Sequence, residues 1–132
     1  MSREKLRVYI SGPITGTTDH MERFAEAEKK LTEAGVEVLN PARMGAELPE
    51  TFTHAEHLEV DVAALKQCDA IYMMDGWQNS QGARQEFIEA KQNGILVFSK
   101  DEIVELSRIA GRFADQAATA VRAVTDQMLM EA

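Results

Sequence analysis

The sequence of 132 residues has one cysteine, three prolines and no long hydrophobic run. The single cysteine, Cys68, excludes a disulfide within the chain and a metal site built on several thiolates, and it is typical of a reducing compartment. A membrane-spanning helix needs ~20 consecutive apolar residues, and no stretch approaches that length. The first residues also lack the apolar core of a secretory signal. We therefore expect a cytoplasmic protein without a membrane partner.

Positive charge is scarce, because 14 Lys and Arg stand against 22 Asp and Glu, which gives a net charge of -8. A nucleic-acid polymer binds through many basic side chains that neutralise its phosphates, so this charge balance argues against such a partner. A single phosphate of a small molecule could still bind at backbone N–H groups. We expect a small-molecule partner.

Signatures of cofactors are also missing. The sequence has neither a Walker loop nor a complete Gly-x-Gly-x-x-Gly fingerprint. His54 and His57 lie three residues apart on a predicted helix without a third ligand, and His20 has no neighbouring ligand in sequence. We therefore expect no metal and no cofactor.

Strand and helix patterns alternate over residues 6–99. Strands are predicted at 6–12, 35–41, 70–75 and 94–99, with helices over about 20–34, 54–68 and 80–92. Such a βαβ series forms a parallel sheet with helices on both faces. The expected fold is α/β, a flavodoxin- or Rossmann-like sheet of four to five strands in a single domain over residues 1–132. Residues 42–53 show too little periodicity for an assignment.

Residues 101–131 form a predicted C-terminal helical extension, as one helix or a broken pair. Apolar residues recur there at intervals of three or four, namely Ile103, Leu106, Ile109, Phe113, Ala117, Val121, Val124 and Met128. This stripe either packs on the chain's own sheet or forms a subunit interface.

Polar segments follow the first and third strands. Ligands of such sheets bind beyond the carboxyl ends of the strands, so these segments define a candidate site. Its candidate residues are Ser11, Gly12, Ile14, Asp75, Trp77, Ser80 and Gly82. Ser80 either offers a hydroxyl to a phosphate or simply caps the helix that follows.

Two carboxylates stand out beside this edge. Glu86 lies one or two turns into the helix that starts near Ser80, where an ordinary helix would expose it. Asp61 lies between Val60 and Val62, and a partly buried aspartate needs polar partners. The setting of Asp61 is therefore the more unusual of the two.

Several segments together resemble the nucleoside 2-deoxyribosyltransferase superfamily. They are Tyr9-Ile-Ser-Gly12 on the first strand, Asp61 in a helix that ends at Asp69, the apolar third strand, and Ser80-x-Gly82-x-x-x-Glu86. The superfamily includes deoxynucleoside 5′-monophosphate N-glycosidases, and the resemblance covers about residues 6–99. It implies cleavage of an N-glycosidic bond by hydrolysis or by transfer to another base, and a homo-oligomer, a dimer or tetramer.

The resemblance also implies roles for three residues. Glu86 matches the nucleophile that forms a glycosyl-enzyme, Asp61 matches the aspartate that helps to protonate the departing base, and Tyr9 matches the tyrosine that orients the glutamate. A carboxylate suits an oxocarbenium-like transition state. Burial and a neighbouring carboxylate both raise the pKa of a carboxyl group, which proton donation at neutral pH requires.

Some positions depart from the superfamily's pattern or have a simpler explanation. Arg84 stands where related hydrolases have a small residue, and it either contacts a phosphate or obstructs one. Trp77 either stacks on a base or packs internally, and Asp75 either binds sugar hydroxyls or ends its strand. A non-catalytic module that senses or sequesters a nucleotide or nucleotide sugar stays open as an alternative, because a fold does not determine a function.

Overall fold

The computed structural model describes residues 3–131, and within that range it also leaves the side chains of Val121 and Glu131 undescribed. Four parallel strands form its sheet in the order β2-β1-β3-β4. They are β1 (Arg7–Ser11), β2 (Glu37–Leu39), β3 (Ala70–Met73) and β4 (Leu96–Phe98). In the central pairings, Val8 lies opposite Val38 on one side and opposite Ala70 on the other. The expected parallel α/β fold is confirmed.

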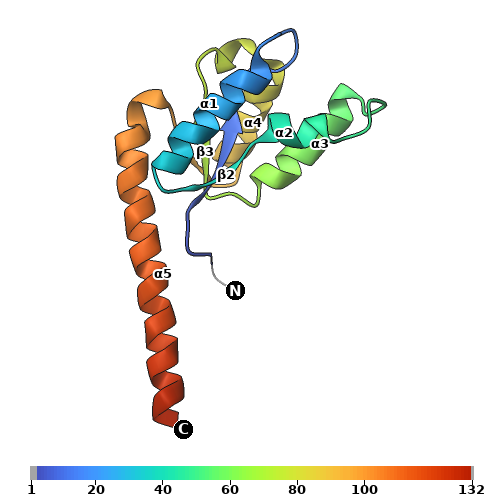
Figure 1. Ribbon diagram of the computed structural model, residues 1–132. Helices are drawn as coiled ribbons and strands as arrows, with labels where there is room; N and C mark the ends of the chain where they lie inside the picture. The colour runs from blue at the N-terminus through green and yellow to red at the C-terminus, as the bar shows by residue number, and fades with distance from the viewer. Residues whose placement is uncertain (1–2, 132) are drawn as a thin grey trace.

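Helices connect these strands and cover both faces of the sheet (Figure 1). They are α1 (His20–Glu33), α2 (Pro41–Ala46), α3 (His54–Leu65), α4 (Gln81–Gln92) and α5 (Ile103–Glu131), with short 3-10 turns η1 (Trp77–Asn79) and η2 (Lys100–Glu102). The helices at 20–34, 54–68 and 80–92 were predicted to within a few residues, which is the usual uncertainty at helix ends.

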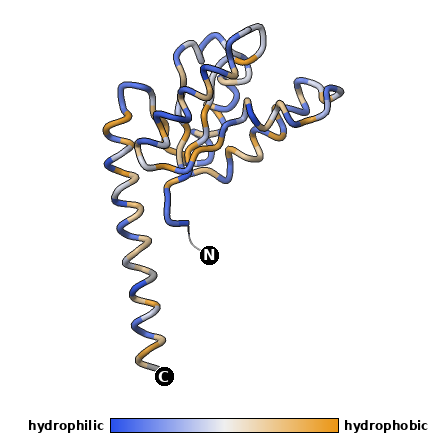
Figure 2. Tube along the Cα trace, in the orientation of Figure 1, coloured by the Kyte–Doolittle hydropathy of each residue, from blue (hydrophilic) through white to orange (hydrophobic). Residues whose placement is uncertain are grey.

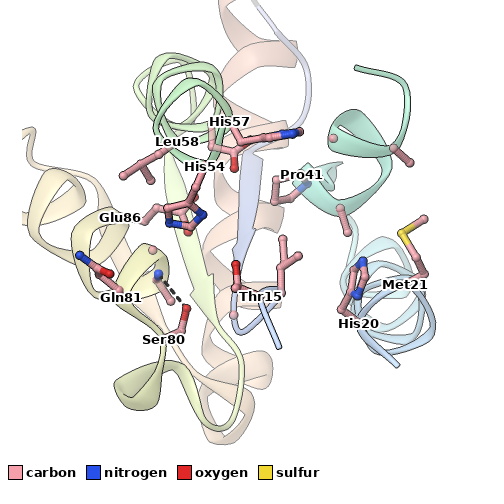
Figure 3. Close-up of a pocket in the computed structure, with 18 of the residues that line it drawn as sticks. Thr15, His20, Met21, Pro41, His54, His57, Leu58, Ser80, Gln81 and Glu86 are labelled. Carbon is pink, nitrogen blue, oxygen red and sulfur yellow. Dashed lines mark hydrogen bonds between the residues drawn. The ribbon is translucent and has the colours of Figure 1, made fainter. Parts of the chain in front are cut away.

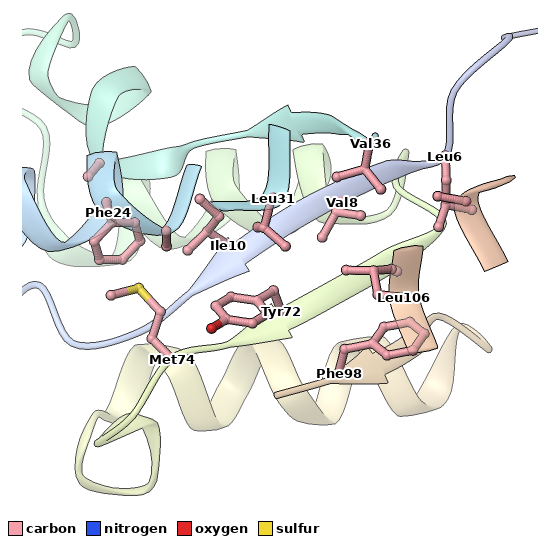
Figure 4. Close-up of a cluster of buried hydrophobic side chains, with 14 residues drawn as sticks. Leu6, Val8, Ile10, Phe24, Leu31, Val36, Tyr72, Met74, Phe98 and Leu106 are labelled. Carbon is pink, nitrogen blue, oxygen red and sulfur yellow. The ribbon is translucent and has the colours of Figure 1, made fainter. Parts of the chain in front are cut away.

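The alternation of side chains along β1 divides the core in two. Val8 and Ile10 point to one face, where they pack with residues of α1 and with Leu106 of α5 (Figure 4). Tyr9 points to the opposite face, which α3 and α4 cover through Leu65 and Ala90. This division follows from the period of two in a strand, and it leaves β1 buried on both faces.

The short helix α2 is an addition to the predicted elements, because it lies in the segment 42–53 that had no assignment. Asn40 precedes it, and its side-chain oxygen accepts hydrogen bonds from the backbone N–H groups of Ala42 and Arg43, at 3.0 and 3.3 Å. Pro41 occupies the first helical position, where its missing N–H costs nothing. The Asn-Pro pair thus starts a helix immediately after β2 ends.

The C-terminal segment is one continuous helix, α5, rather than a broken pair. Its first turns pack on the sheet, with Leu106 and Ala110 buried and Phe113 against the same cluster. Beyond these turns α5 leaves the body of the protein and projects away from it (Figure 1). Within the described residues, no helix is sufficiently long and apolar to cross a membrane.

Candidate active site

The carboxylate of Glu86 is buried, with 6% of the residue exposed. It receives two hydrogen bonds from β1: the hydroxyl of Tyr9 donates to Oε2, and the hydroxyl of Ser11 donates to Oε1 at 2.8 Å. Both oxygens of the carboxylate are therefore held, which fixes the position of the group.

The backbone dictates this arrangement. Tyr9 and Ser11 are two residues apart on β1, so their side chains lie on the same face of the sheet. Helix α4 covers that face and is capped by Ser80, whose hydroxyl accepts a hydrogen bond from the backbone N–H of Ala83 at 3.2 Å. Glu86 then lies on the side of α4 that turns toward the sheet, together with buried Ala83 and Ala90. The expectation that a glutamate on an ordinary helix would be exposed therefore does not hold here.

Glu86 borders a cavity of about 490 Å³, which falls within the usual range for small-molecule sites. The cavity lies where β1, β2 and β3 end, and α1, α2, α3 and α4 surround it (Figure 3). Four of the predicted substrate-binding residues line it, namely Gly12, Ile14, Ser80 and Gly82. The cavity is therefore where the sequence places the site, at the carboxyl end of the sheet.

Asp61 on α3 also lines the cavity, so the structure brings both predicted carboxyl groups to one site. Burial raises the pKa of Glu86 to about 7, against which the hydrogen bonds from Tyr9 and Ser11 act, while the charge of Asp61 adds to the rise. Burial alone raises the pKa of Asp61 to about 6. The pKa of Tyr9 lies well above its ordinary value, mainly because of burial and the nearby charge of Glu86, so Tyr9 stays a hydrogen-bond donor.

Four predicted substrate-binding residues do not line this cavity, and one of them, Ser11, instead donates its hydrogen bond to Glu86 from β1. The exposed carboxylate of Asp75 pairs with Lys100 at 2.8 Å. Trp77 stacks on Phe87, with ring centroids 4.8 Å apart, and the guanidinium of Arg84 donates to the carbonyl of Gln78 at 2.8 Å. The side chains of Asp75, Trp77 and Arg84 therefore contact other residues of the protein and do not line the cavity.

Other lining residues were not among the predicted ones. Helix α2 contributes a wall through Pro41 and Ala42, and the Asn-Pro signal for a helix start could have indicated it. His54 and His57 line the cavity from the first turns of α3, and His20 lines it from the start of α1. Within the described residues, no three potential metal ligands come together.

His20 differs from the other histidines of the site. Its Nδ1 atom is buried, and it has no hydrogen-bond partner in the described part of the chain. Figure 3 shows His20 and Met21 across the cavity from Glu86 and His54. A buried polar atom without a partner costs free energy, so this imidazole is available to a ligand.

Comparison with known proteins places the chain in a family. Residues 6–99 match the model of a family described as Domain of unknown function (DUF4406). The chain belongs to this family. No curated protein matches the DUF4406 chain in sequence. A solved structure of a 2-deoxyribosyltransferase from the psychrotolerant bacterium Bacillus psychrosaccharolyticus is similar to it, with 17% identity over 70% of each chain and a TM-score of 0.58. This likeness confirms the fold that the sequence resemblance implied.

We predict that Glu86→Gln makes the protein more stable at neutral and alkaline pH. The folded state raises the pKa of Glu86 from 4.5 to about 7, so it binds a proton that the unfolded chain releases. The contribution of Glu86 to the free energy of unfolding is fully present below about pH 4.5 and is lost as the pH rises through about 7. At about 1.4 kcal/mol per pKa unit, the loss approaches ~3 kcal/mol.

The measurement is urea unfolding of wild type and Glu86→Gln at about pH 5 and about pH 8. The gain in the free energy of unfolding should be large at the higher pH and small at the lower one. Glu89→Gln is the matched control, because it makes the same replacement on α4 outside the cavity. Its effect on the free energy of unfolding should not differ in this way between the two pH values. A gain that is equal at both pH values would mean that the buried carboxylate does not titrate in this range.

Proposed function

We propose that the DUF4406 protein cleaves the N-glycosidic bond of a nucleoside or nucleoside 5′-monophosphate through a glycosyl-enzyme on Glu86. The observation that carries this proposal is the carboxylate of Glu86, buried beside a cavity and held at both oxygens by Tyr9 and Ser11. A second carboxyl group, Asp61, lines the same cavity. A retaining glycosidase uses two carboxyl groups, one ionised as the nucleophile and one protonated as the acid.

The first half of the reaction uses both carboxyl groups. One oxygen of ionised Glu86 bonds to the anomeric carbon while the carbon–nitrogen bond to the base breaks, and its electron pair stays on the base nitrogen. Protonated Asp61 transfers its proton to the base as it leaves. The hydroxyl groups of Tyr9 and Ser11 keep the carboxylate in place before the attack.

The second half frees Glu86. An acceptor, either water or the nitrogen of another base, attacks the anomeric carbon, and the bond to the Glu86 oxygen breaks. Asp61, now ionised, takes the proton that the acceptor loses. Water as the acceptor makes the protein a hydrolase, and a base makes it a deoxyribosyltransferase.

The lining of the cavity suits the two parts of a nucleoside. Ser80 and Gly82 at the start of α4 offer polar groups to the sugar or its phosphate. On the opposite wall, Met21 and Pro41 provide apolar surface for a flat base, and His20 provides a ring nitrogen for the edge of that base. Neither Lys nor Arg is among the described residues that line the cavity, so a 5′-phosphate would bind at the backbone N–H groups at the start of α4.

We predict that Glu86→Gln abolishes release of free base, whereas Glu89→Gln retains it. The amide of Gln cannot form the glycosyl ester, while its size lets the substrate still bind. Chromatography would follow base release from a panel of deoxynucleosides and their 5′-monophosphates, with and without an acceptor base.

Three outcomes of this assay differ in meaning. Base release that needs Glu86 supports the proposal, and a dependence on acceptor marks a transferase. Mass spectrometry of the wild type should also find the sugar on a peptide that contains Glu86. Saturable binding of nucleotides without any release would instead favour the sensing or sequestering module.

We predict that Asp61→Asn slows base release by roughly 10²- to 10⁴-fold, the usual contribution of a general acid. The loss should be much smaller for a synthetic deoxyriboside whose leaving group needs no proton. Rates for both kinds of substrate would be compared with those of Glu59→Gln, a carboxylate on the same helix outside the cavity. An equal loss on both substrates would contradict the assignment of Asp61 as the acid.

We predict that Tyr9→Phe shifts the acidic limb of the pH profile of kcat/KM to higher pH. The limb reports ionisation of Glu86, and the hydrogen bond from Tyr9 lowers the pKa of this carboxyl. Without the hydroxyl, a higher pH is needed to ionise Glu86. Tyr72→Phe removes a hydroxyl from the opposite face of the sheet and should leave the limb in place. An unmoved limb in Tyr9→Phe would show that Tyr9 does not tune Glu86.

A further inference from the structure

The projecting part of α5 has an apolar stripe that nothing in the described chain covers. Ile103, Leu106, Ile109, Ala110 and Phe113 at the start of the helix pack on the core. The remaining helix, residues 114–131, leaves the body (Figure 1), and alternating polar and apolar positions continue along it (Figure 2). Val124 is 58% exposed and Met128 is 66% exposed. The family match ends at residue 99 and the last strand, β4, ends at Phe98, so both end before this segment.

The stripe continues the face that packs on the body. With about 3.6 residues per turn, Ala117, Val124 and Met128 lie in line with Leu106 and Phe113. These positions are separated by four or seven residues, which is typical of helices that pair with one another. A projecting helix gains most of its stability from packing of its apolar face, so this spacing points to a partner helix.

Charge in the segment indicates which partner. Its charged residues between Phe113 and Glu131 are Asp115, Arg122 and Asp126, and all three lie on the side of the helix opposite the stripe. The stripe itself is uncharged, so it is complementary to the identical stripe of a second copy. The whole chain has a net charge of -8, so two copies repel each other over most of their surface. The neutral stripe is the part at which two copies can meet.

The position of the body sets the direction of the pairing. The body packs on the same face of α5 as the stripe, from Ile103 to Phe113. If the two α5 helices were parallel, the sheet and helices α1–α4 of both copies would have to occupy the same space between them, and they would collide. Antiparallel helices place the bodies at opposite ends, and residues 114–131 then overlap over about 27 Å of helix.

We propose that two copies of this chain form a symmetric dimer, in which residues 114–131 of α5 pair antiparallel through the stripe of Ala117, Val124 and Met128. Such an interface uses the same surface of both copies, as two-fold dimers do. It holds the two cavities at opposite ends of a helical rod. This pairing is independent of the proposed reaction, because none of its residues lines the cavity.

Sedimentation equilibrium of the full chain tests the dimer. The wild type should have twice the chain mass of 14.7 kDa, and Val124→Asp should fall to half of the wild-type mass because it places a charge in the stripe. Thr119→Asp introduces the same residue on the opposite side of α5 and should remain dimeric. Circular dichroism would verify that both variants keep their helix content. A monomeric wild type, or a dimeric Val124→Asp, would overturn the proposal.

Disulfide trapping tests the direction. In the overlap of residues 114–131, Ala117 of one chain lies beside Met128 of the partner chain. In a Cys68→Ala background, a mixture of Ala117→Cys and Met128→Cys chains should oxidise mainly to the mixed disulfide. A predominance of the disulfide between two Ala117→Cys chains would show a parallel pair and would contradict the antiparallel arrangement.

Discussion

The buried carboxylate of Glu86 is the constraint on which the rest of the site depends. Removing an ionisable group from water is costly unless other groups hydrogen-bond to it, and here Tyr9 and Ser11 do so from one strand. Both donors must lie on the face of β1 that α4 covers, and α4 must start immediately after Ser80 for Glu86 to reach them. A shift of one residue in β1 would turn both hydroxyls to the other face.

The central place of β1 in the sheet satisfies this constraint. Because β1 lies between β2 and β3, its register is set from both sides, and its apolar residues Val8 and Ile10 anchor it to the opposite core. The strand order β2-β1-β3 also brings the carboxyl ends of these three strands together. The loop after β1, helix α2 after β2 and the start of α4 after β3 therefore all reach one cavity.

Sequence patterns predict the elements of this fold better than they predict the directions of side chains. The four strands and the longer helices follow from apolar periodicity, which reflects burial directly. Helix α2, with six residues, is too short to show a period, and only its Asn40-Pro41 start is visible. Trp77 lies beside the site in sequence, but the η1 turn directs its ring onto Phe87, a contact that depends on tertiary packing.

Glu86 is a second residue whose side-chain direction does not follow from the local sequence. Local sequence predicts an exposed residue on a helix, and only the resemblance over residues 6–99 singled it out. Glu86 is buried because α4 packs against β1. Ser11 on this strand, 75 residues away in sequence, donates a hydrogen bond to Glu86. Long-range contacts of this kind leave no trace in the spacing of nearby residues.

The two carboxyl groups of the cavity are best understood as one unit. The pKa values of Glu86 and Asp61 are about 7 and about 6, and the charge of Asp61 raises the pKa of Glu86. Between about pH 6 and about pH 7, Asp61 is therefore mostly ionised and Glu86 mostly protonated. The first half of the proposed reaction needs Glu86 ionised and Asp61 protonated, whereas in the second half Asp61 is ionised and Glu86 is held in the ester. Moving the proton from Glu86 to Asp61 costs about 1.4 kcal/mol for a difference of one pKa unit, so the arrangement that starts the reaction stays accessible.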